Sequence, residues 1–268
     1  MIPALALAAV CEGSGMILDP GHPGMLLLED NEVADHLFTA SIEGAMSGGS
    51  ADRVSLPIPV EDPEALASDG AGLWVVGSHS RSKSGGRKLL RERILQIQSG
   101  VSTLWTVDWT GCAACGDPAS PAAPGPALNV EGAAFWGTHL WLGLRAPLLD
   151  DGRARLVQLT PSGVSGVFGV RDVTIDLGGL GVRDLAVQPG NPDVLWILAG
   201  PSSGNASGAI YTLSSEAASP VRAAVPVPED AEGLVVLADG GLRVLTDGAA
   251  KSDGTCKTPS ALYRLAPR

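Results

Sequence analysis

The sequence is poor in charged and aromatic side chains and has only four cysteines. Charged residues make up 18% and aromatic residues 4% of its 268 residues, whereas glycine and proline are abundant, with 35 and 20 copies. This composition argues against a helical bundle or a disordered chain and is typical of many short strands joined by turns. Because 45% of the residues are hydrophobic, the chain can still bury a substantial core.

Long hydrophobic runs and an excess of basic residues are also missing. No apolar stretch approaches the ~18 residues of a membrane span, so no membrane segment is expected. The net charge of −11 argues against general binding to nucleic acid or anionic membranes and is compatible with cations. The apolar N-terminus has no Lys or Arg before it, so we expect a strand of the mature protein rather than a cleavable leader.

The cysteines do not form a zinc motif. Cys112 and Cys115 make a single C-x-x-C, and neither a second pair nor a nearby histidine cluster completes four zinc ligands. A disulfide or a pair of thiols in a loop is therefore favoured over a metal. Cys11 and Cys256 lie near opposite ends of the chain and could pair if the termini meet.

A repeated unit organises the chain. An acidic residue opens an apolar strand, and a turn, a second strand and two further apolar runs follow, with a repeat of about 50–70 residues. Four short strands per unit predict a β-propeller blade, and five units predict five blades. The five opening acids are Glu12, Glu64, Glu131, Asp184 and Glu232.

The ends of the chain fit a closed ring. The last unit has only three strand-like runs, and residues 2–10 supply a fourth, which would remove an open sheet edge. We therefore predict one all-β propeller domain over residues 1–268. The Pro- and Ala-rich segment at about 108–126 reads as an insertion on one rim. Six blades are the alternative, if the long unit that contains this segment is split.

Five carboxylates at the strand starts should form a ring around the axis. Such a ring must take up protons, pair with cations or bind a metal, because like charges repel. A hard cation such as Ca²⁺ would use oxygen ligands from these five acids, so calcium is the predicted cofactor. The alternative is structural: the acids accept backbone hydrogen bonds and the following glycines allow close packing.

Catalytic candidates cluster near the expected axis. His79, in the turn G-S-H-S, could act as a general base on metal-bound water or as a ligand, although a turn histidine is more often structural. Arg145 and Arg183 follow or precede inner strands and could hold negative charge beside Glu131. No G-x-S-x-G elbow surrounds the serines that flank His79, so a serine hydrolase is not expected.

A basic segment, residues 77–94, stands out in this acidic chain. It contains six of the 18 Lys and Arg residues and lacks P-loop spacing. Planar guanidinium groups suit phosphates and carboxylates, so the segment could hold an anionic substrate or partner at the channel mouth. The alternative is a solvated connector. The candidate substrate-binding residues are Ser78, Arg81, Arg91 and Arg93.

The order of several short motifs resembles a known family. E-D-P-E-A-L-A, G-S-H-S, N-V-E-G-A-A-F, G-L-R-A-P and G-V-R-D-L-A are similar to the bacterial domain-of-unknown-function family numbered 3616, over most of the chain. The resemblance implies a β-propeller-like domain and no defined activity. One family glycine is replaced by Ala65. A more distant likeness is to calcium-dependent lactonases and strictosidine-synthase-like propellers.

Three functions remain open at this point. The first is a calcium-assisted hydrolase of an ester, lactone or phosphoester, with His79, Glu131, Arg145 and Arg183 as catalytic residues. The second is a non-catalytic propeller that binds an anionic small molecule or a protein. The third is a metal-free glycoside hydrolase that uses two ring carboxylates. A monomer is expected, and a periplasmic or secreted location is favoured over the cytoplasm.

Overall fold

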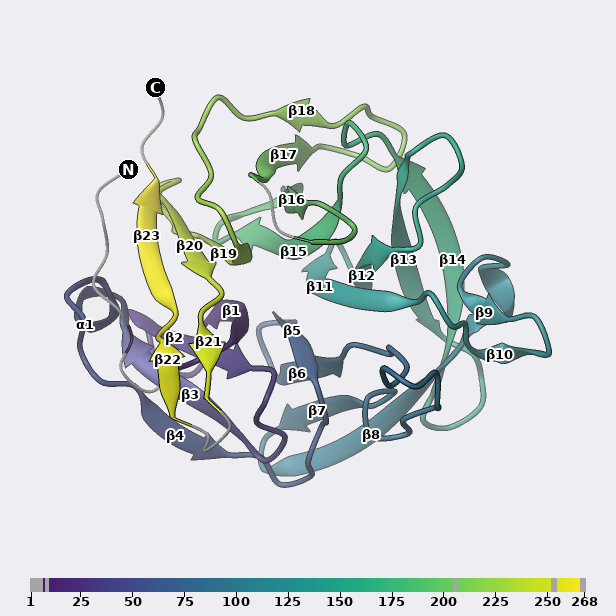
Figure 1. Cartoon of the computed structure of the whole chain (residues 1–268), viewed down its shortest axis with the longest axis horizontal. Helices are drawn as coiled ribbons and strands as arrows, with labels where there is room; N and C mark the ends of the chain where they lie inside the picture. The colour runs from purple at the N-terminus through teal and green to yellow at the C-terminus, as the bar shows by residue number, and fades with distance from the viewer. Residues whose placement is uncertain (1–6, 8–9, 205–206, 252–254, 266–268) are drawn as a thin grey trace.

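Groups of antiparallel strands surround a central axis in the computed structural model (Figure 1). The structure describes residues 7, 10–204, 207–251 and 255–265. Apolar residues alternate with turn residues along the chain, and each group therefore forms as a meander of consecutive strands. Among the described residues, the one α-helix is the single turn α1 (Ile42–Met46), and no helix is long and apolar enough to cross a membrane.

The strands follow the repeat that the sequence predicts. The first group is β1 (Gly13–Leu18), β2 (Met25–Asp30), β3 (His36–Ser41) and β4 (Asp52–Ser55), and the second is β5 (Pro63–Ser68), β6 (Leu73–Gly77), β7 (Ile94–Gln98) and β8 (Val101–Asp108). The third is β11 (Asn129–Trp136), β12 (His139–Ala146), β13 (Ala154–Pro161) and β14 (Val167–Ile175). The fourth is β15 (Gly181–Gln188), β16 (Asn191–Gly200), β17 (Ala209–Leu213) and β18 (Val221–Arg222), and the fifth is β19 (Ala231–Val236), β20 (Leu242–Thr246) and β23 (Ala261–Leu265).

The first strands of the groups form a closed ring. Each of β1, β5, β11 and β15 contacts the next first strand, and β19 contacts β1 again. The all-β propeller prediction is confirmed by this arrangement. Two groups share one eight-stranded sheet, because the outer strands β14 and β8 pair in parallel. The hydrogen-bonded sheets alone therefore do not give the number of blades. The ring of inner strands, by contrast, has five members.

The two ends of the chain meet at the last group. A disulfide with an S–S distance of 2.05 Å joins Cys11, just before β1, to Cys256 in β22 (Cys256–Thr258). Most of the predicted closing strand, residues 2–10, lies outside the described residues. Within it, the Leu7 N–H donates to the Ser260 carbonyl at 2.8 Å, and the Ser260 N–H donates to the Val10 carbonyl at 2.9 Å.

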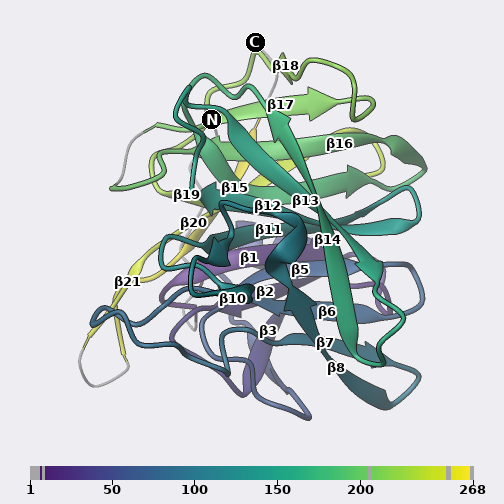
Figure 2. The same ribbon diagram turned by 90° about the vertical axis from the view of Figure 1, so that its right-hand side faces the viewer.

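The predicted insertion lies at the rim. It holds the 3₁₀ turn η1 (Trp109–Gly111) and the short hairpin β9 (Gly116–Asp117) and β10 (Ser120–Pro124). A disulfide joins Cys112 to Cys115, which is the first of the two alternatives predicted for this pair. The side view shows β21 (Ala249–Ala250) projecting at one face of the ring (Figure 2).

The hydrophobic core lies between neighbouring groups. Trp74 of β6 and Trp141 of β12 occupy equivalent second-strand positions and are 5% and 1% exposed. Trp74 contacts Phe135 of the next inner strand, with ring centroids 5.5 Å apart. Burial of such large aromatic side chains contributes most of the packing that holds adjacent blades together. The core therefore fixes the inner strands around the axis and positions their side chains there.

Candidate functional site

A β-bulge interrupts each inner strand close to its start. In all five pairings of a first with a second strand, one extra residue lies on the inner strand at this point. A bulge re-aims the side chain of the extra residue and is common beside functional sites. The side chains at this position all line one cavity at the end of the channel, and they belong to Ser14, Glu64, Glu131, Arg183 and Glu232.

The structure corrects two members of the predicted acid ring. In the fourth unit, Arg183 rather than Asp184 occupies the bulge position and lines the cavity. In the first unit, Ser14 takes the position that was assigned to Glu12. The ring therefore contains three acids, one arginine and one serine. A shift of one residue reverses the direction of a strand side chain, which explains why Asp184 points elsewhere.

The two displaced acids have other hydrogen bonds. The buried Asp184 carboxylate accepts from the Leu185 N–H at 2.7 Å and from the Leu234 N–H of the neighbouring inner strand at 2.6 Å. The Glu12 carboxylate accepts from the Ala250 N–H at 3.0 Å. Asp184 thus joins adjacent inner strands, and Glu12 joins the start of β1 to β21, as expected for acids that accept backbone hydrogen bonds.

Glu131 is held by guanidinium groups on two sides. Arg145 Nη1 donates to Glu131 Oε1 at 2.7 Å, and Arg183 Nη1 donates to Glu131 Oε2 at 2.9 Å. Asn129 Nδ2 donates to the same Oε1 at 2.7 Å. The Glu131 side chain is 4% exposed, so these charge-assisted bonds replace the water that burial removes. The sequence therefore places Glu131, Arg145 and Arg183 correctly beside one another.

Arg183 also connects Glu131 to the next acid in the ring. The same Nη1 atom donates to Glu232 Oε2 at 2.7 Å. One guanidinium group shared between two carboxylates does not fully offset their burial and mutual repulsion. Burial and the charge of Glu131 therefore raise the pKa of Glu232 to about 8. Near neutral pH, Glu232 holds a proton more often than an ordinary glutamate does.

Glu64 lies in the same cavity but accepts no hydrogen bond from either arginine, among the described residues. Burial raises the pKa of Glu64 well above its usual range, and the negative charge of Glu131 raises it further. Among the described residues, no hydrogen bond reaches its carboxyl group. The pKa of Glu64 is therefore higher than that of an ordinary glutamate, and Glu64 shares the cavity with a carboxylate that two arginines hold. Asp247, which follows β20, completes the acidic lining, and burial raises its pKa to about 6.

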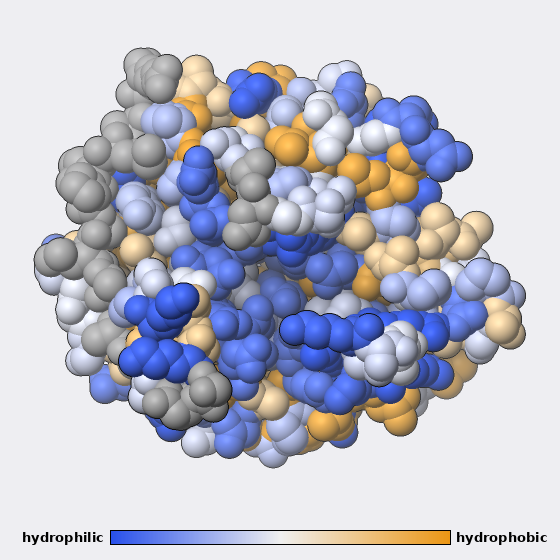
Figure 3. All heavy atoms as spheres, in the orientation of Figure 1, coloured by the Kyte–Doolittle hydropathy of each residue, from blue (hydrophilic) through white to orange (hydrophobic). Residues whose placement is uncertain are grey.

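The cavity is small and faces the open end of the channel. Its volume is about 110 Å³, and Gly13 and Asn31 complete its lining. On the face drawn in Figure 3, hydrophilic side chains gather around the hollow at the centre. Its lining contains four acids and two arginines, so the cavity suits a small polar group and disfavours an anion.

A further buried acid, Glu29 of β2, was not predicted. Its carboxyl group is fully buried, and neither oxygen has a hydrogen-bond partner among the described residues. A Cβ atom added at Gly15 would lie 2.7 Å from Glu29 Oε2, so Glu29 approaches the inner strand where a side chain is missing. Burial and the charge of Asp184 raise its pKa well above the usual range. The only signal in the sequence was an acid at the end of the run M-L-L-L-E-D.

His79 does not lie at the ring. Its Nδ1 atom donates to the Gly77 carbonyl at 2.9 Å, and its ring packs edge-on against Trp109 at 5.4 Å. Burial lowers the pKa of His79 to about 4, so the imidazole is neutral near pH 7. The side chain lines a different pocket, together with Trp109 and Glu92. The prediction of a general base near the axis is corrected by this position.

The predicted substrate-binding residues mostly bind groups of the protein itself. Ser78 is fully buried and donates to the Asp62 carboxylate at 2.5 Å. Arg91 is 2.9 Å from the same carboxylate, Arg93 donates to a backbone carbonyl at 2.7 Å, and Arg81 pairs with Asp117. The basic segment is therefore largely neutralised, which favours the connector interpretation over an anion site.

The ring residues do not suit the predicted calcium ion. Within the described part of the chain, no group of three or more His, Cys, Asp or Glu side chains is arranged to hold a metal. Arg145 and Arg183 already pair with Glu131, and a divalent cation there would lie against two guanidinium groups. Asp184 and Glu12 point away from the cavity. Bound calcium therefore stays a prediction, which a direct measurement of metal content would test.

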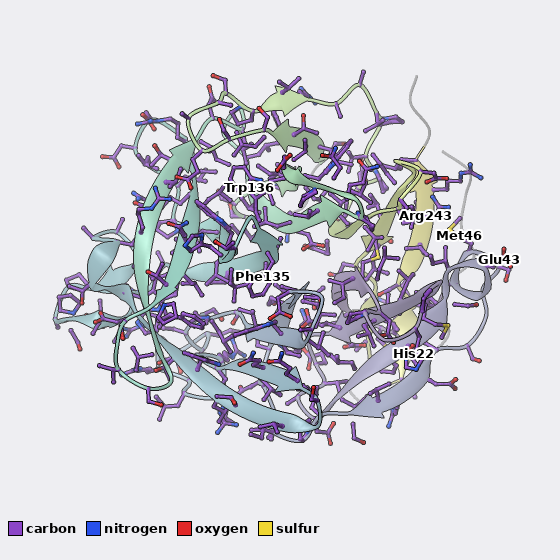
Figure 4. All side chains as sticks on the ribbon, turned by 180° about the vertical axis from the view of Figure 1, so that it is seen from behind. His22, Glu43, Met46, Phe135, Trp136 and Arg243 are labelled. Atoms are coloured by element: carbon purple, nitrogen blue, oxygen red, sulfur yellow. A yellow bond between two sulfur atoms is a disulfide. The ribbon has the colours of Figure 1, made fainter. Side chains whose placement is uncertain are left out.

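The opposite end of the channel is apolar. A cavity of about 140 Å³ lies there, lined by the later residues of the same inner strands, including Leu18, Phe135 and Val236. Seen from behind, Phe135 lies beside the central opening (Figure 4). The channel thus has one acid- and arginine-lined end and one hydrocarbon-lined end, and polar chemistry is restricted to the strand starts.

Comparison with solved structures gives a fold likeness. A GH43 beta 1,3 galactosidase with galactodeoxynojirimycin is 7% identical over 98% of this chain and 94% of that chain, with a TM-score of 0.57. YCF48 bound to D1 peptide and the Dos1 propeller are 14% and 11% identical over 100% and 99% of this chain and 73% and 74% of theirs, each with a TM-score of 0.41. At 7% identity, the likeness to the galactosidase is one of fold alone.

A family model covers the part of the chain that carries the ion-pair network. No curated protein matches the chain. The model described as Protein of unknown function (DUF3616) matches residues 125–239. This segment runs from just before β11 to just after β19 and contains Glu131, Arg145, Arg183 and Glu232. The match is to the family that the sequence motifs resemble, and it covers residues 125–239.

Proposed function

We propose that the polar end of the channel is the active site of a metal-independent glycoside hydrolase. The observation that supports this most is that one cavity holds Glu64, whose pKa burial raises well above the usual range, and Glu131, which two arginines hold. Carboxyl groups whose surroundings differ in this way can divide into a proton donor and a stabilising anion. Acetal hydrolysis needs both roles and needs no metal.

The proposed step uses three carboxyl groups. Glu64 donates its proton to the glycosidic oxygen as the bond between this oxygen and the anomeric carbon breaks. Water adds to the anomeric carbon and gives a proton to Asp247, which is ionised yet more basic than usual because its pKa is about 6. The Glu131 carboxylate stabilises the positive charge that develops on the sugar ring. Asp247 then releases its proton to solvent, and Glu64 takes one up.

The same geometry disfavours the ester, lactone and phosphoester substrates that a metal site would suit. Acyl transfer develops an oxyanion, which needs hydrogen-bond donors that are not already engaged. Arg145 donates to Glu131 and to the carbonyls of Pro201 and Gly204, and Arg183 is shared between two carboxylates. A phosphoester would also bring negative charge toward four acids. An uncharged, hydroxylated substrate fits these walls better.

The size of the cavity limits what can enter. Its volume of about 110 Å³ is below the ~300 Å³ of a pocket for a drug-sized ligand. It can accept the reacting end of one sugar ring, and the rest of the substrate must remain in the open channel mouth. We therefore propose cleavage at chain ends rather than within a polymer.

The test is a panel of aryl glycosides with paired leaving groups. Glu64→Gln should lower kcat on 4-nitrophenyl glycosides by about 10²–10⁴-fold, because the leaving group then receives no proton. On 2,4-dinitrophenyl glycosides, whose leaving group needs little protonation, the loss should be much smaller. Glu12→Gln removes an acid outside the cavity and is the matched control, and EDTA should leave the activity unchanged.

Two results would contradict the proposal. The first is a wild-type protein that hydrolyses none of the glycosides, and the second is equal activity of wild type and Glu64→Gln on both leaving groups. Glycoside binding without turnover, measured by calorimetry and lost in Glu131→Gln, would instead favour the alternative of a non-catalytic binding module.

A further inference from the structure

A second pocket lies on the second blade, away from the acid cavity. It has a volume of about 520 Å³, within the usual ~300–1,000 Å³ range for small-molecule pockets. Much of its wall is apolar and comes from Leu89, Leu104, Trp105 and Val167. Trp105 is fixed there, because its ring stacks on Phe168 with centroids 4.5 Å apart.

Two buried nitrogen atoms in this wall have no partner among the described residues. They are His79 Nε2 and Trp109 Nε1, on side chains of residues that are 1% and 0% exposed. Buried polar atoms are nearly always paired in folded proteins, so two orphaned atoms in adjacent rings need an explanation. His79 and Trp109 pack edge-on, with ring centroids 5.4 Å apart, and both line the pocket.

The two atoms have opposite hydrogen-bonding character. His79 Nδ1 contacts the Gly77 carbonyl, which can only accept, so Nδ1 carries the hydrogen. In the neutral imidazole, Nε2 is then an acceptor, and burial, which lowers the pKa of His79 to about 4, keeps the ring neutral. Trp109 Nε1 can only donate. The wall therefore contains one acceptor and one donor, on two rings whose centroids are 5.4 Å apart.

The charged residues of the pocket are already paired. Arg87 Nε and Nη2 donate to the two oxygens of Glu92, at 2.5 and 2.6 Å. Arg93 and Asp108, which also line the pocket, are hydrogen-bonded as well, so a charged ligand would have to displace an existing partner, whereas a neutral ligand would not. Arg87 and Leu89 belong to the exposed loop of residues 83–90, and Leu89 is 66% exposed. Rotation of these two side chains can admit a ligand without a change in the sheet.

We infer that this pocket binds a neutral, flat ligand that carries a cyclic amide or imide. The ligand N–H donates to His79 Nε2, its carbonyl accepts from Trp109 Nε1, and its ring lies against the apolar wall at Trp105. The inference is independent of the proposed hydrolase, because it uses none of the residues of the acid cavity.

The test compares glutarimide with N-methylglutarimide on the wild-type protein, by saturation-transfer NMR and titration calorimetry. Methylation removes only the donor, so the affinity should fall about tenfold or more. Trp109→Phe should weaken glutarimide binding, and His79→Phe should abolish the difference between the two probes. Trp105→Phe is the control, because its indole N–H is already bonded to Gln96, and it should keep the preference.

The wild-type comparison can overturn the inference without any variant. No saturation transfer to glutarimide, or equal binding of both probes, would overturn the inference. Binding that persists unchanged in both Trp109→Phe and His79→Phe would place the ligand elsewhere and would also overturn it.

Discussion

The two ends of the central channel are built from the same five strands but have opposite chemistry. At the strand starts the channel presents Glu64, Glu131, Arg183 and Glu232, and further along the same strands it presents hydrocarbon side chains. The difference arises at the bulges, because one extra residue per inner strand turns a side chain toward the axis. A regular strand would continue its alternation and leave both ends alike. Local backbone irregularity therefore separates the site from the core.

The largest expected effect is at Arg183, which holds the polar end together. Arg183→Met leaves Glu131 and Glu232 without their shared guanidinium group and should lower the free energy of unfolding by about 3–5 kcal/mol. The measurement is urea denaturation at pH 7. Arg153→Met, which breaks an exposed pair with Asp151, is the control and should cost far less. Equal losses in the two variants would show that the network contributes no more than a surface pair.

The matching change at the apolar end is Leu234→Ala. Leu234 is fully buried and lines the hydrocarbon cavity, so truncation should cost about 2–5 kcal/mol. Unlike the loss at Arg183, this loss should differ little between pH 5 and pH 8, because alanine keeps the backbone N–H that donates to Asp184 and the change removes no titrating group. Urea denaturation of wild type and variant at both pH values measures it. A strong pH dependence of the difference would mean that the two ends are coupled.

A smaller effect concerns pH. The pKa of Glu232 is about 8 in the folded protein and near 4.5 when unfolded, so the folded state holds the extra proton between these values. The stability should therefore fall as pH rises from about 5 to 8, by about 1 kcal/mol per pH unit, and should level off above pH 8. Denaturation of Glu232→Gln should show a shallower slope. A wild-type stability that rises over this range would contradict the assignment.

Much of the fold could be predicted, because four short apolar runs per repeat require a blade and an acid marks the start of each inner strand. The exact ring members could not all be predicted. The bulge adds one residue, and in the fourth unit Arg183 and Asp184 stand side by side, so alternation alone cannot decide which faces the axis. In the first unit the bulge residue is Ser14, which is not acidic, so the acid pattern pointed to Glu12, two residues earlier.

Other parts of the site depend on contacts between segments that lie apart in the sequence. Glu29 reaches the inner strand because Gly15 has no side chain, and this meeting of β2 with β1 leaves no local pattern. His79 follows a second strand, as expected, yet the rim insertion supplies Trp109 and buries it. Long-range packing decided both positions.

The most direct test of the account is the protonation state of Glu64. A ¹³C NMR titration of the glutamate carboxyl groups, with the signal assigned by its loss in Glu64→Gln, measures its pKa. The account predicts that Glu64 keeps its proton at pH 7, because burial and the charge of Glu131 raise its pKa well above the usual range. A Glu64 signal that titrates near 4.5 would contradict the pairing of a proton donor with an arginine-held carboxylate, and the proposed hydrolase with it.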